Sequence, residues 1–306
     1  LLLLVAVLVP SLSHTLRGTR GWFRLPFLSF QPSEVARLVT LFIVSDYLVK
    51  RISRIEEFST VLGCLGVAAP AFALILLEPD LSCTMVLFPT LLFMLFCAGA
   101  RLGQLAALAG GGALAVVLPL FWTWLSLKPE RTASGFLAFV ASLSHFGLDF
   151  WLAVGGLALL LGVAAWFLAK MRYQIPWFYY AAIFLVLAGG LTSGVLAQHA
   201  LKEYQRKRFI SFVSPEADPL GSGYNSRQSV IALGSGGFWG KGMFSGTQGR
   251  LGFLPERHTD FVFAVIGEEG GFLGALLTLS LYLFVLWRLV AAARGARDEF
   301  GYLLAC

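Results

Sequence analysis

The hydrophobic pattern of this chain is a series of long apolar runs separated by short polar segments. The runs approach the length of roughly 20 residues that an α-helix needs to cross a bilayer. They show no sign of the short alternating segments that are typical of transmembrane strands. The pattern therefore predicts an all-α, polytopic membrane helix bundle. The candidate spans are 1–9 (the end of one), 33–49, 58–77, 82–98, 103–125, 149–169, 176–197, 260–289 and 300–306 (the start of one).

Both ends of the sequence fall inside apolar runs, because it opens with LLLLVAVLV and stops at FGYLLAC. We therefore expect residues 1–306 to be a single membrane domain that is incomplete at both ends. Only 13% of the residues are charged, against roughly 25% in soluble domains. The net charge of +6 does not indicate nucleic-acid binding, since the excess lies in short segments between spans. The four cysteines sit in apolar runs and are interpreted as small buried hydrophobes.

One polar, glycine-rich stretch, residues 202–274, interrupts the apolar pattern. It holds much of the charge and nearly every side chain that could carry chemistry. A membrane protein that places such a segment between two spans is usually building a site there. We therefore expect a long, partly ordered loop at 198–259 to carry the function.

The basic residues of the short loops predict the orientation. Lys50, Arg51 and Arg54 mark one face, and Arg101 falls on the same face two spans later. By the positive-inside rule this face is cytoplasmic, which puts the 198–259 loop outside. That loop is also basic, and an anionic ligand on the outer face would explain its charge.

Two short motifs place carboxylates at span ends. In QPSEVAR, Glu34 and Arg37 are i,i+3 on a helix that enters the membrane, so they can pair; the alternative is a helix-start pair at the interface. In EPDLSC, Pro79 breaks the helix and leaves Glu78 and Asp80 at a turn near the outer face. The alternative for this second motif is a solvated turn.

Two further motifs lie in the long loop. Asp218 precedes Pro219, which biases Asp218 away from helical backbone and towards a turn. Its carboxylate is well placed there as a general base. The alternative is that Asp218 only forms the turn. The glycines of GSGGFWG could bring backbone N–H groups to a diphosphate, with Lys241 adding a cation. This segment is neither a P-loop nor a dinucleotide-binding fingerprint.

Adjacent acids, Glu268 and Glu269, lie one to two turns into the span at 260–289. Inside a membrane such groups must face protein or water. Glu268 could instead pair with a basic residue and serve only packing. A metal site built from His258, Asp260 and the glutamates is a further alternative.

Taken together and in this order, these motifs resemble the SEDS family (shape, elongation, division and sporulation) of RodA and FtsW type. The GKG and GTQ forms are more similar to the RodA, or elongation, branch. The matching segments are QPSE (31–34), EPDL (78–81), DPLGSGY (218–224), QS (228–229), GSGG (234–237), GKG (240–242), GTQ (246–248), LPERHTDF (254–261) and GEEGGFLG (267–274).

The resemblance implies a peptidoglycan glycosyltransferase of the bacterial cytoplasmic membrane. Such a protein polymerises lipid II, a disaccharide on undecaprenyl diphosphate, at the outer face and works with a class B penicillin-binding protein. The family's essential loop aspartate corresponds to Asp218, and its acidic–basic pair to Glu34 and Arg37. We also predict substrate-binding or supporting roles for a wider set: Glu78, Asp80, Arg208, Tyr224, Lys241, Gln248, His258, Asp260 and Glu268.

The mechanism expected from this resemblance has Asp218 as the base and the lipid diphosphate as the leaving group. Lys241, Arg208 and Arg37 are the candidates that stabilise the diphosphate charge, and Tyr224 would position the loop. A divalent cation, Mg²⁺ or Mn²⁺, could assist, although no metal ligand is identified.

The chain departs from the family pattern at several positions. Arg37 stands where the family usually has Lys. Arginine can still pair with a carboxylate, but it cannot act as a titrating amine as a lysine could. EPDLSC and GYN replace EPDLG and GYQ. We also predict that the apolar runs 149–169 and 176–197, within 126–197, form an inserted two-span hairpin.

Two other functions remain open. A lipid II flippase or other transporter would carry its acids mid-membrane on broken helices, whereas here they concentrate in one loop and at span ends. A non-catalytic scaffold for the penicillin-binding protein would keep the fold without polymerising activity.

Overall fold

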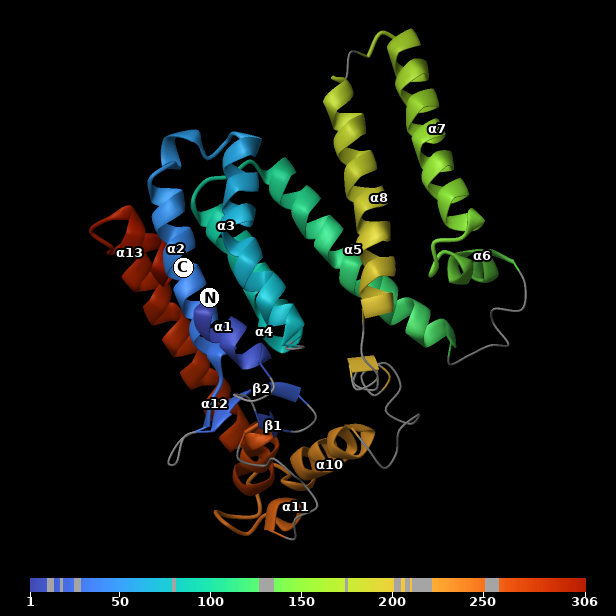
Figure 1. Ribbon diagram of the computed structural model, residues 1–306. Helices are drawn as coiled ribbons and strands as arrows, with labels where there is room; N and C mark the ends of the chain where they lie inside the picture. The colour runs from blue at the N-terminus through green and yellow to red at the C-terminus, as the bar shows by residue number, and fades with distance from the viewer. Residues whose placement is uncertain are drawn as a thin grey trace. The chain divides into compact units, whose positions relative to one another are not determined.

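The computed structural model describes residues 1–9, 14–16, 19–24, 29–78, 81–126, 135–173, 176–200, 205–206, 210, 222–250 and 259–306. These residues are mainly helical (Figure 1), as the apolar runs predict. The helices are α1 (Leu2–Leu8), α2 (Pro32–Val49), a 3-10 turn (Ile52–Arg54), α3 (Phe58–Leu77), α4 (Leu81–Cys97), α5 (Leu102–Ser126), α6 (Phe136–Ser142), α7 (Leu148–Lys170), α8 (Trp177–Ala200), α10 (Ser222–Ser235), α11 (Thr247–Arg250), α12 (Val262–Arg294) and α13 (Glu299–Ala305).

Five helices in the described part of the chain are long and apolar enough to cross a membrane. They are Phe58–Leu77, Leu102–Ser126, Leu148–Lys170, Tyr179–His199 and Val262–Arg294, and a shorter apolar helix lies at Cys83–Cys97. The span expected at 33–49 forms as α2 but is outside this set; it carries Glu34, Arg37 and Asp46. The chain is a multi-pass membrane protein with an all-α membrane domain.

A small antiparallel sheet precedes α2, in a segment for which the sequence pattern predicted no strands. Its order is β1 (His14–Leu16), β2 (Thr19–Arg24) and β3 (Ser29–Phe30), with Phe23 paired to Phe30. The strands are too short for periodicity to reveal them, and a sheet this small needs a neighbour to pack on. That neighbour is α1 together with α2, both of which contact β2.

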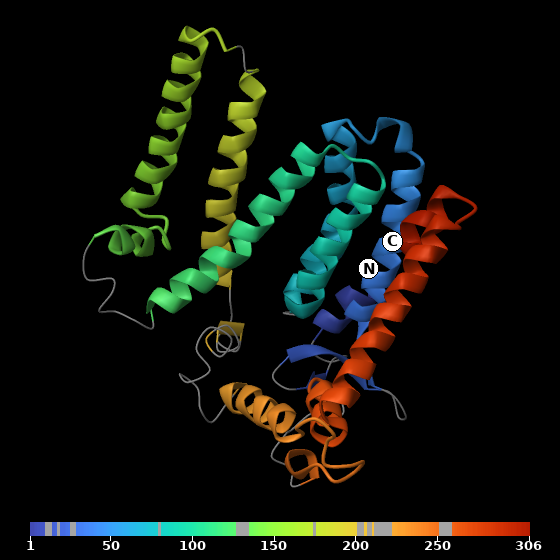
Figure 2. The same cartoon turned by 180° about the vertical axis from the view of Figure 1, so that it is seen from behind.

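The contacts divide the chain into two units, residues 1–116, 151–194 and 289–306, and residues 117–150 and 195–288. In the first unit α2, α3 and α4 pack side by side and α13 lies along α2 (Figure 1 and Figure 2). The core of this unit is a continuous apolar cluster between these helices. It includes Val44, Leu48, Val61, Cys64, Leu87, Leu91 and Leu95.

Glycines let helices of the first unit approach closely. A Cβ at Gly112 in α5 would overlap the ring of Phe88 in α4, and one at Gly190 in α8 would overlap Leu114 in α5. Small residues at such contacts are typical of membrane helix packing, where backbones must come close for dispersion contacts to form.

The up-and-down order of α2, α3 and α4 sorts the loops of this unit to two ends. At one end Arg101 reaches the carboxylate of Glu56 at 3.0 Å, so the turn after α2 meets the turn after α4. This confirms that Arg51 and Arg54 share an end with Arg101. Glu34, Glu78 and Cys83 mark the other end, because they lie where α2 starts, α3 ends and α4 starts.

The second unit is built around α10 and the first part of α12. Ala232 of α10 and Ala264 of α12 are buried, with Phe261 and Val265 packed against them. Helical backbone geometry continues through α12 except at Gly271, whose φ of 63° and ψ of −159° break the helix. The helix therefore has two parts, 262–270 and 272–294.

Candidate functional site

Four of the predicted site residues lie outside the described residues: Asp80, Arg208, Asp218 and His258. Their roles stay predictions. The remaining predicted residues fall into two groups, one in each unit. Glu34, Arg37 and Glu78 belong to the first unit, and Tyr224, Lys241, Gln248, Asp260 and Glu268 to the second.

The predicted pair at the start of α2 is formed. Arg37 Nη2 donates to Glu34 Oε2 at 2.6 Å, one helical turn away. The other carboxylate oxygen of Glu34 lies 3.9 Å from Cys83 Sγ at the start of α4. QPSE and the helix that follows EPD are thus neighbours. The pair is only partly covered, with the side chain of Glu34 52% exposed and that of Arg37 27% exposed.

Glu78 occupies the C-terminal cap of α3 and is 1% exposed. This contradicts the alternative of a solvated turn. One carboxylate oxygen is 3.9 Å from the position of a Cβ on Gly21, in the small sheet. Burying a carboxylate is costly unless polar groups surround it. The sheet therefore supplies part of the cover over this acid, a contact that the sequence could not predict.

The second group is organised by Glu268, whose side chain is fully buried. Its Oε1 accepts hydrogen bonds from Lys241 Nζ at 2.8 Å, Thr247 N at 2.8 Å and Thr247 Oγ1 at 2.8 Å. The backbone N–H of Gln248 donates to the same carboxylate at 3.1 Å. Four donors on one buried carboxylate form a charge-assisted network. The GKG, GTQ and GEEGG motifs therefore meet at a single carboxylate. Of the two possibilities for Glu268, protein or water, the structure shows protein, and it shows the pairing with a basic residue that was the alternative interpretation.

The turn that carries Lys241 fills the break in α12. An intact helix would bond the N–H groups of residues 272 and 273 to the carbonyls of 268 and 269. Here Phe272 N donates to Gly237 O at 2.9 Å and Leu273 N to Phe238 O at 3.3 Å. The two carbonyls accept instead from Lys241 N and Gly242 N, both at 3.0 Å. The turn replaces the four backbone partners that the break removes.

This arrangement corrects the interpretation of the glycine-rich segment as a diphosphate nest. The N–H groups of Lys241 and Gly242 point at carbonyls of α12, and Gly240 N donates to Gly236 O at 2.8 Å. The glycines are needed for close approach: a Cβ on Gly240 would overlap Glu269 O, and one on Gly271 would overlap Gly240 N. Both also have positive φ, of 80° and 63°.

We expect Gly240→Ala to lower the stability of the protein by about 1–3 kcal/mol, because the methyl group meets backbone at a left-handed position. Gly234→Ala is the matched control, since this α10 glycine has nothing within 4 Å of a Cβ and should gain up to about 1 kcal/mol of helix propensity. Thermal unfolding of the detergent-purified protein measures both. A Gly240→Ala melting temperature at or above that of Gly234→Ala would contradict the close-approach argument.

The other predicted residues have simpler surroundings. Tyr224 is half-buried on α10, and Asp260 is exposed just before α12. The side-chain Oε1 of Gln248 is buried, with no hydrogen-bond partner among the described residues. The sequence analysis missed Thr247, which holds Glu268 through both backbone and side chain; its place inside the GTQ motif was the available signal. Within the described ranges no three His, Cys, Asp or Glu residues come together to hold a metal ion.

The sequence family FTSW_RODA_SPOVE, described as "Cell cycle protein", matches residues 1–143 and 155–306. The chain is similar to the probable peptidoglycan glycosyltransferase FtsW of Nitrosococcus halophilus, with 31% identity over 96% of this chain and 55% of the relative. It is also similar to the peptidoglycan glycosyltransferase RodA of Treponema pallidum, with 31% identity over 94% of this chain and 65% of the relative.

A third relative is the peptidoglycan glycosyltransferase MrdB of Escherichia coli, with 28% identity over 99% of this chain and 61% of the relative. The chain thus spans well under two thirds of FtsW and MrdB and just under two thirds of RodA. FtsW and RodA match at the same identity, so the preference for the elongation branch stays a prediction.

A solved structure on the structural coordination of polymerization and crosslinking by a peptidoglycan synthase complex shares the fold. Its TM-score is 0.52 at 24% identity, over 99% of this chain and 62% of that chain. The family match includes most of α7 and all of α8, and whether these two helices are an insertion stays a prediction. Because the match runs through almost the whole sequence, the chain belongs to the FTSW_RODA_SPOVE family of cell cycle proteins.

Proposed function

We propose that the protein containing this chain is a peptidoglycan glycosyltransferase that polymerises lipid II. The observation that carries the proposal is that the shared motifs meet in space. QPSE lies beside the helix after EPD through Glu34 and Cys83, and GKG, GTQ and GEEGG meet on Glu268. Relatives that carry this activity in their names match nearly the full chain, which supports the same assignment.

In the proposed reaction Asp218 accepts the proton of the acceptor sugar's 4-hydroxyl. That oxygen forms a bond to the anomeric carbon of the donor, and the bond from this carbon to the lipid diphosphate breaks with inversion. Arg208 and Arg37 are the candidates that stabilise the charge of the departing diphosphate. The Lys241 ammonium already binds Glu268 and Thr247, so we assign it to holding the loop. Assistance by Mg²⁺ or Mn²⁺ stays a prediction, and no step here is routed through it.

We further propose that the protein lies in the bacterial cytoplasmic membrane with the 198–259 loop outside. The shared end of Arg51, Arg54 and Arg101 supports this orientation, since basic turns stay cytoplasmic. A class B penicillin-binding protein is the proposed partner. The structural neighbour, from work on the structural coordination of polymerization and crosslinking by a peptidoglycan synthase complex, supports a partner of this kind.

The break in α12 is the one observation that favours a flippase, because transporters bind ions and substrates at broken helices. In a transporter the freed backbone groups and nearby acids face the substrate. Here the turn at 237–242 occupies the freed groups, and Lys241, Thr247 and Gln248 occupy Glu268. The break is therefore filled by the protein itself, which favours a structural junction.

The deciding experiment supplies radiolabelled lipid II to the purified full-length protein in detergent. A polymerase forms glycan strands there, whereas a flippase has no membrane across which to act. Polymer formed without the penicillin-binding protein would also exclude a scaffold. If lipid II stayed monomeric both alone and with the partner added, the proposed function would be wrong.

The Glu34–Arg37 pair gives a prediction that separates function from folding. Because the pair is partly exposed, its loss should change stability by no more than about 1 kcal/mol. We expect Arg37→Gln to lower the rate of lipid II polymerisation by at least about tenfold, as the removal of one charge stabiliser does. Arg37→Lys should keep most of the rate, because an ammonium can still pair with Glu34. Equal rates for both variants would exclude charge pairing as the role of Arg37.

A further inference from the structure

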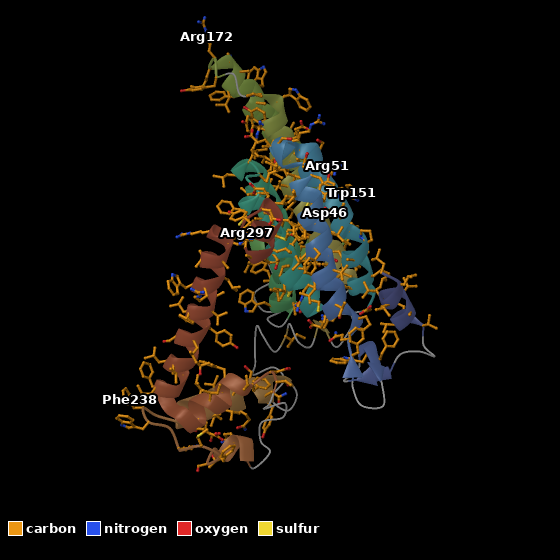
Figure 3. All side chains as sticks on the ribbon, turned by 90° about the vertical axis from the view of Figure 1, so that its left-hand side faces the viewer. Asp46, Arg51, Trp151, Arg172, Phe238 and Arg297 are labelled. Atoms are coloured by element: carbon orange, nitrogen blue, oxygen red, sulfur yellow. The ribbon has the colours of Figure 1, made fainter. Side chains whose placement is uncertain are left out.

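The turn at residues 236–246, which we term the aromatic turn, carries four large apolar side chains on its outside. Phe238, Trp239, Met243 and Phe244 are 54%, 77%, 81% and 83% exposed. Figure 3 shows Phe238 projecting away from the ribbon of this unit. The single charged residue of the turn is Lys241, which is bound to Glu268. An apolar patch without free charge marks a surface that something other than water covers.

The aromatic turn is continuous with the apolar surface of α12. The ring of Phe238 stacks on that of Phe272 at 5.7 Å between centroids and meets Trp239 at 5.2 Å. Phe272 is 55% exposed and begins the apolar face of this candidate span. Acyl chains cover the outward face of a span. The acyl chains that contact Phe272 can therefore also contact Phe238, whose ring stacks on it, and Trp239, whose ring lies next to Phe238.

The length of α12 places the aromatic turn at a membrane boundary. The part after the break, 272–294, is roughly 35 Å long at 1.5 Å per residue, enough to cross a hydrocarbon core of about 30 Å by itself. Gly271 then lies near one edge of that core, with Arg294 at the other end. Trp and Tyr collect at such boundaries, where their rings contact both headgroups and chains, and Trp239 is the residue of this kind in the turn.

Backbone polar groups of the aromatic turn are hydrogen-bonded to α12, as a membrane environment requires. Non-helical backbone is tolerated at membrane depth only where its polar groups are bonded. Four hydrogen bonds join the turn to the broken ends of α12. Phe244, in addition, has a φ of 59°, which a bulky residue rarely adopts. A strained phenylalanine that is 83% exposed gains little from packing inside the protein, which leaves its ring available for contacts outside it.

We propose that the aromatic turn is a membrane anchor, and that Trp239, Met243 and Phe244 insert at the boundary of headgroups and acyl chains beside α12. The anchor fixes the depth of the Lys241–Glu268 junction relative to the bilayer. It is independent of the reaction that the protein performs. A protein partner is the other occupant to consider, and continuity with the lipid-facing surface of Phe272 favours lipid.

Photo-crosslinking tests this directly in the full-length protein. The crosslinker p-benzoylphenylalanine replaces Phe244 or Trp239, and the protein is placed in nanodiscs of phosphatidylethanolamine and phosphatidylglycerol. Intact mass then reports adducts with phospholipid. Leu283, 68% exposed on α12, is the lipid-facing control. Arg172 is the aqueous control, because it is exposed in the turn after α7 and shares the positive φ, 65°, of Phe244 (Figure 3).

We expect lipid adducts at Phe244 and Trp239 to match those at Leu283 and to exceed those at Arg172 by roughly tenfold, as the transfer of one aromatic side chain out of water gives. Adducts no more frequent than at Arg172 would overturn the proposal. Adducts with a protein in native membranes, in place of lipid, would do the same and identify a partner surface. If the crosslinker at the strained position of Phe244 prevents folding, the variant at Trp239 still gives the result.

Discussion

Asp218→Asn should reduce the rate of lipid II polymerisation by roughly 10²–10⁴-fold, the contribution of a positioned general base. Asn keeps the shape and hydrogen-bonding capacity of the side chain but cannot take the proton of the sugar hydroxyl. The measurement is the initial rate of glycan formation from purified lipid II. Binding of lipid II should remain, because the carboxylate acts on the acceptor hydroxyl and not on the diphosphate.

Asp149→Asn is the matched control. Asp149 is an exposed aspartate in the first turn of α7, at the end of that helix away from Lys170, and it has no assigned role. Its replacement should leave the rate of polymerisation unchanged. If Asp218→Asn polymerised as fast as Asp149→Asn, the base would have to be sought elsewhere. Loss of lipid II binding together with rate would instead make Asp218 a substrate ligand.

The sequence was sufficient for features that depend on local pattern. The long apolar helices follow from run length, and Glu34 with Arg37 from i,i+3 spacing. For Glu268 the cost of a carboxylate inside a span limits the surroundings to protein or water, without deciding between them. Each of these needs only the neighbouring residues along one helix.

The features that the sequence could not predict depend on contacts between distant segments. GSGGFWGKG has the composition of an anion-binding loop, yet its N–H groups serve the carbonyls of a break at Gly271, about thirty residues later. Glu78 follows a helix and precedes Pro79, which is typical of an exposed turn, but the small sheet near Gly21 covers it. Backbone hydrogen bonds and burial that are supplied by a distant segment produce no periodic pattern in the sequence.

The same distant contact makes the junction on Glu268 the structural element whose loss should cost most. Glu268→Ala would leave the Lys241 ammonium and three further donors facing an apolar gap where the carboxylate was. Removing one partner of a buried pair costs about 3–5 kcal/mol, since the remaining charge is uncompensated. We expect a loss near this range, measured as the free energy of unfolding in mixed detergent micelles.

Glu269→Ala is the control for that measurement, because the adjacent carboxylate is half-buried and makes no side-chain hydrogen bond or ion pair among the described residues. It should cost no more than about 1 kcal/mol, as replacements away from a network do.

A double-mutant cycle with Lys241→Ala isolates the Lys241–Glu268 pair itself, and we expect a coupling energy of about 1–3 kcal/mol. A coupling near zero, or equal losses for Glu268→Ala and Glu269→Ala, would mean that Lys241 does not hold the turn in the break of α12. The aromatic turn would then need another reason to stay at its depth, and the anchor proposal would rest on its lipid contacts alone.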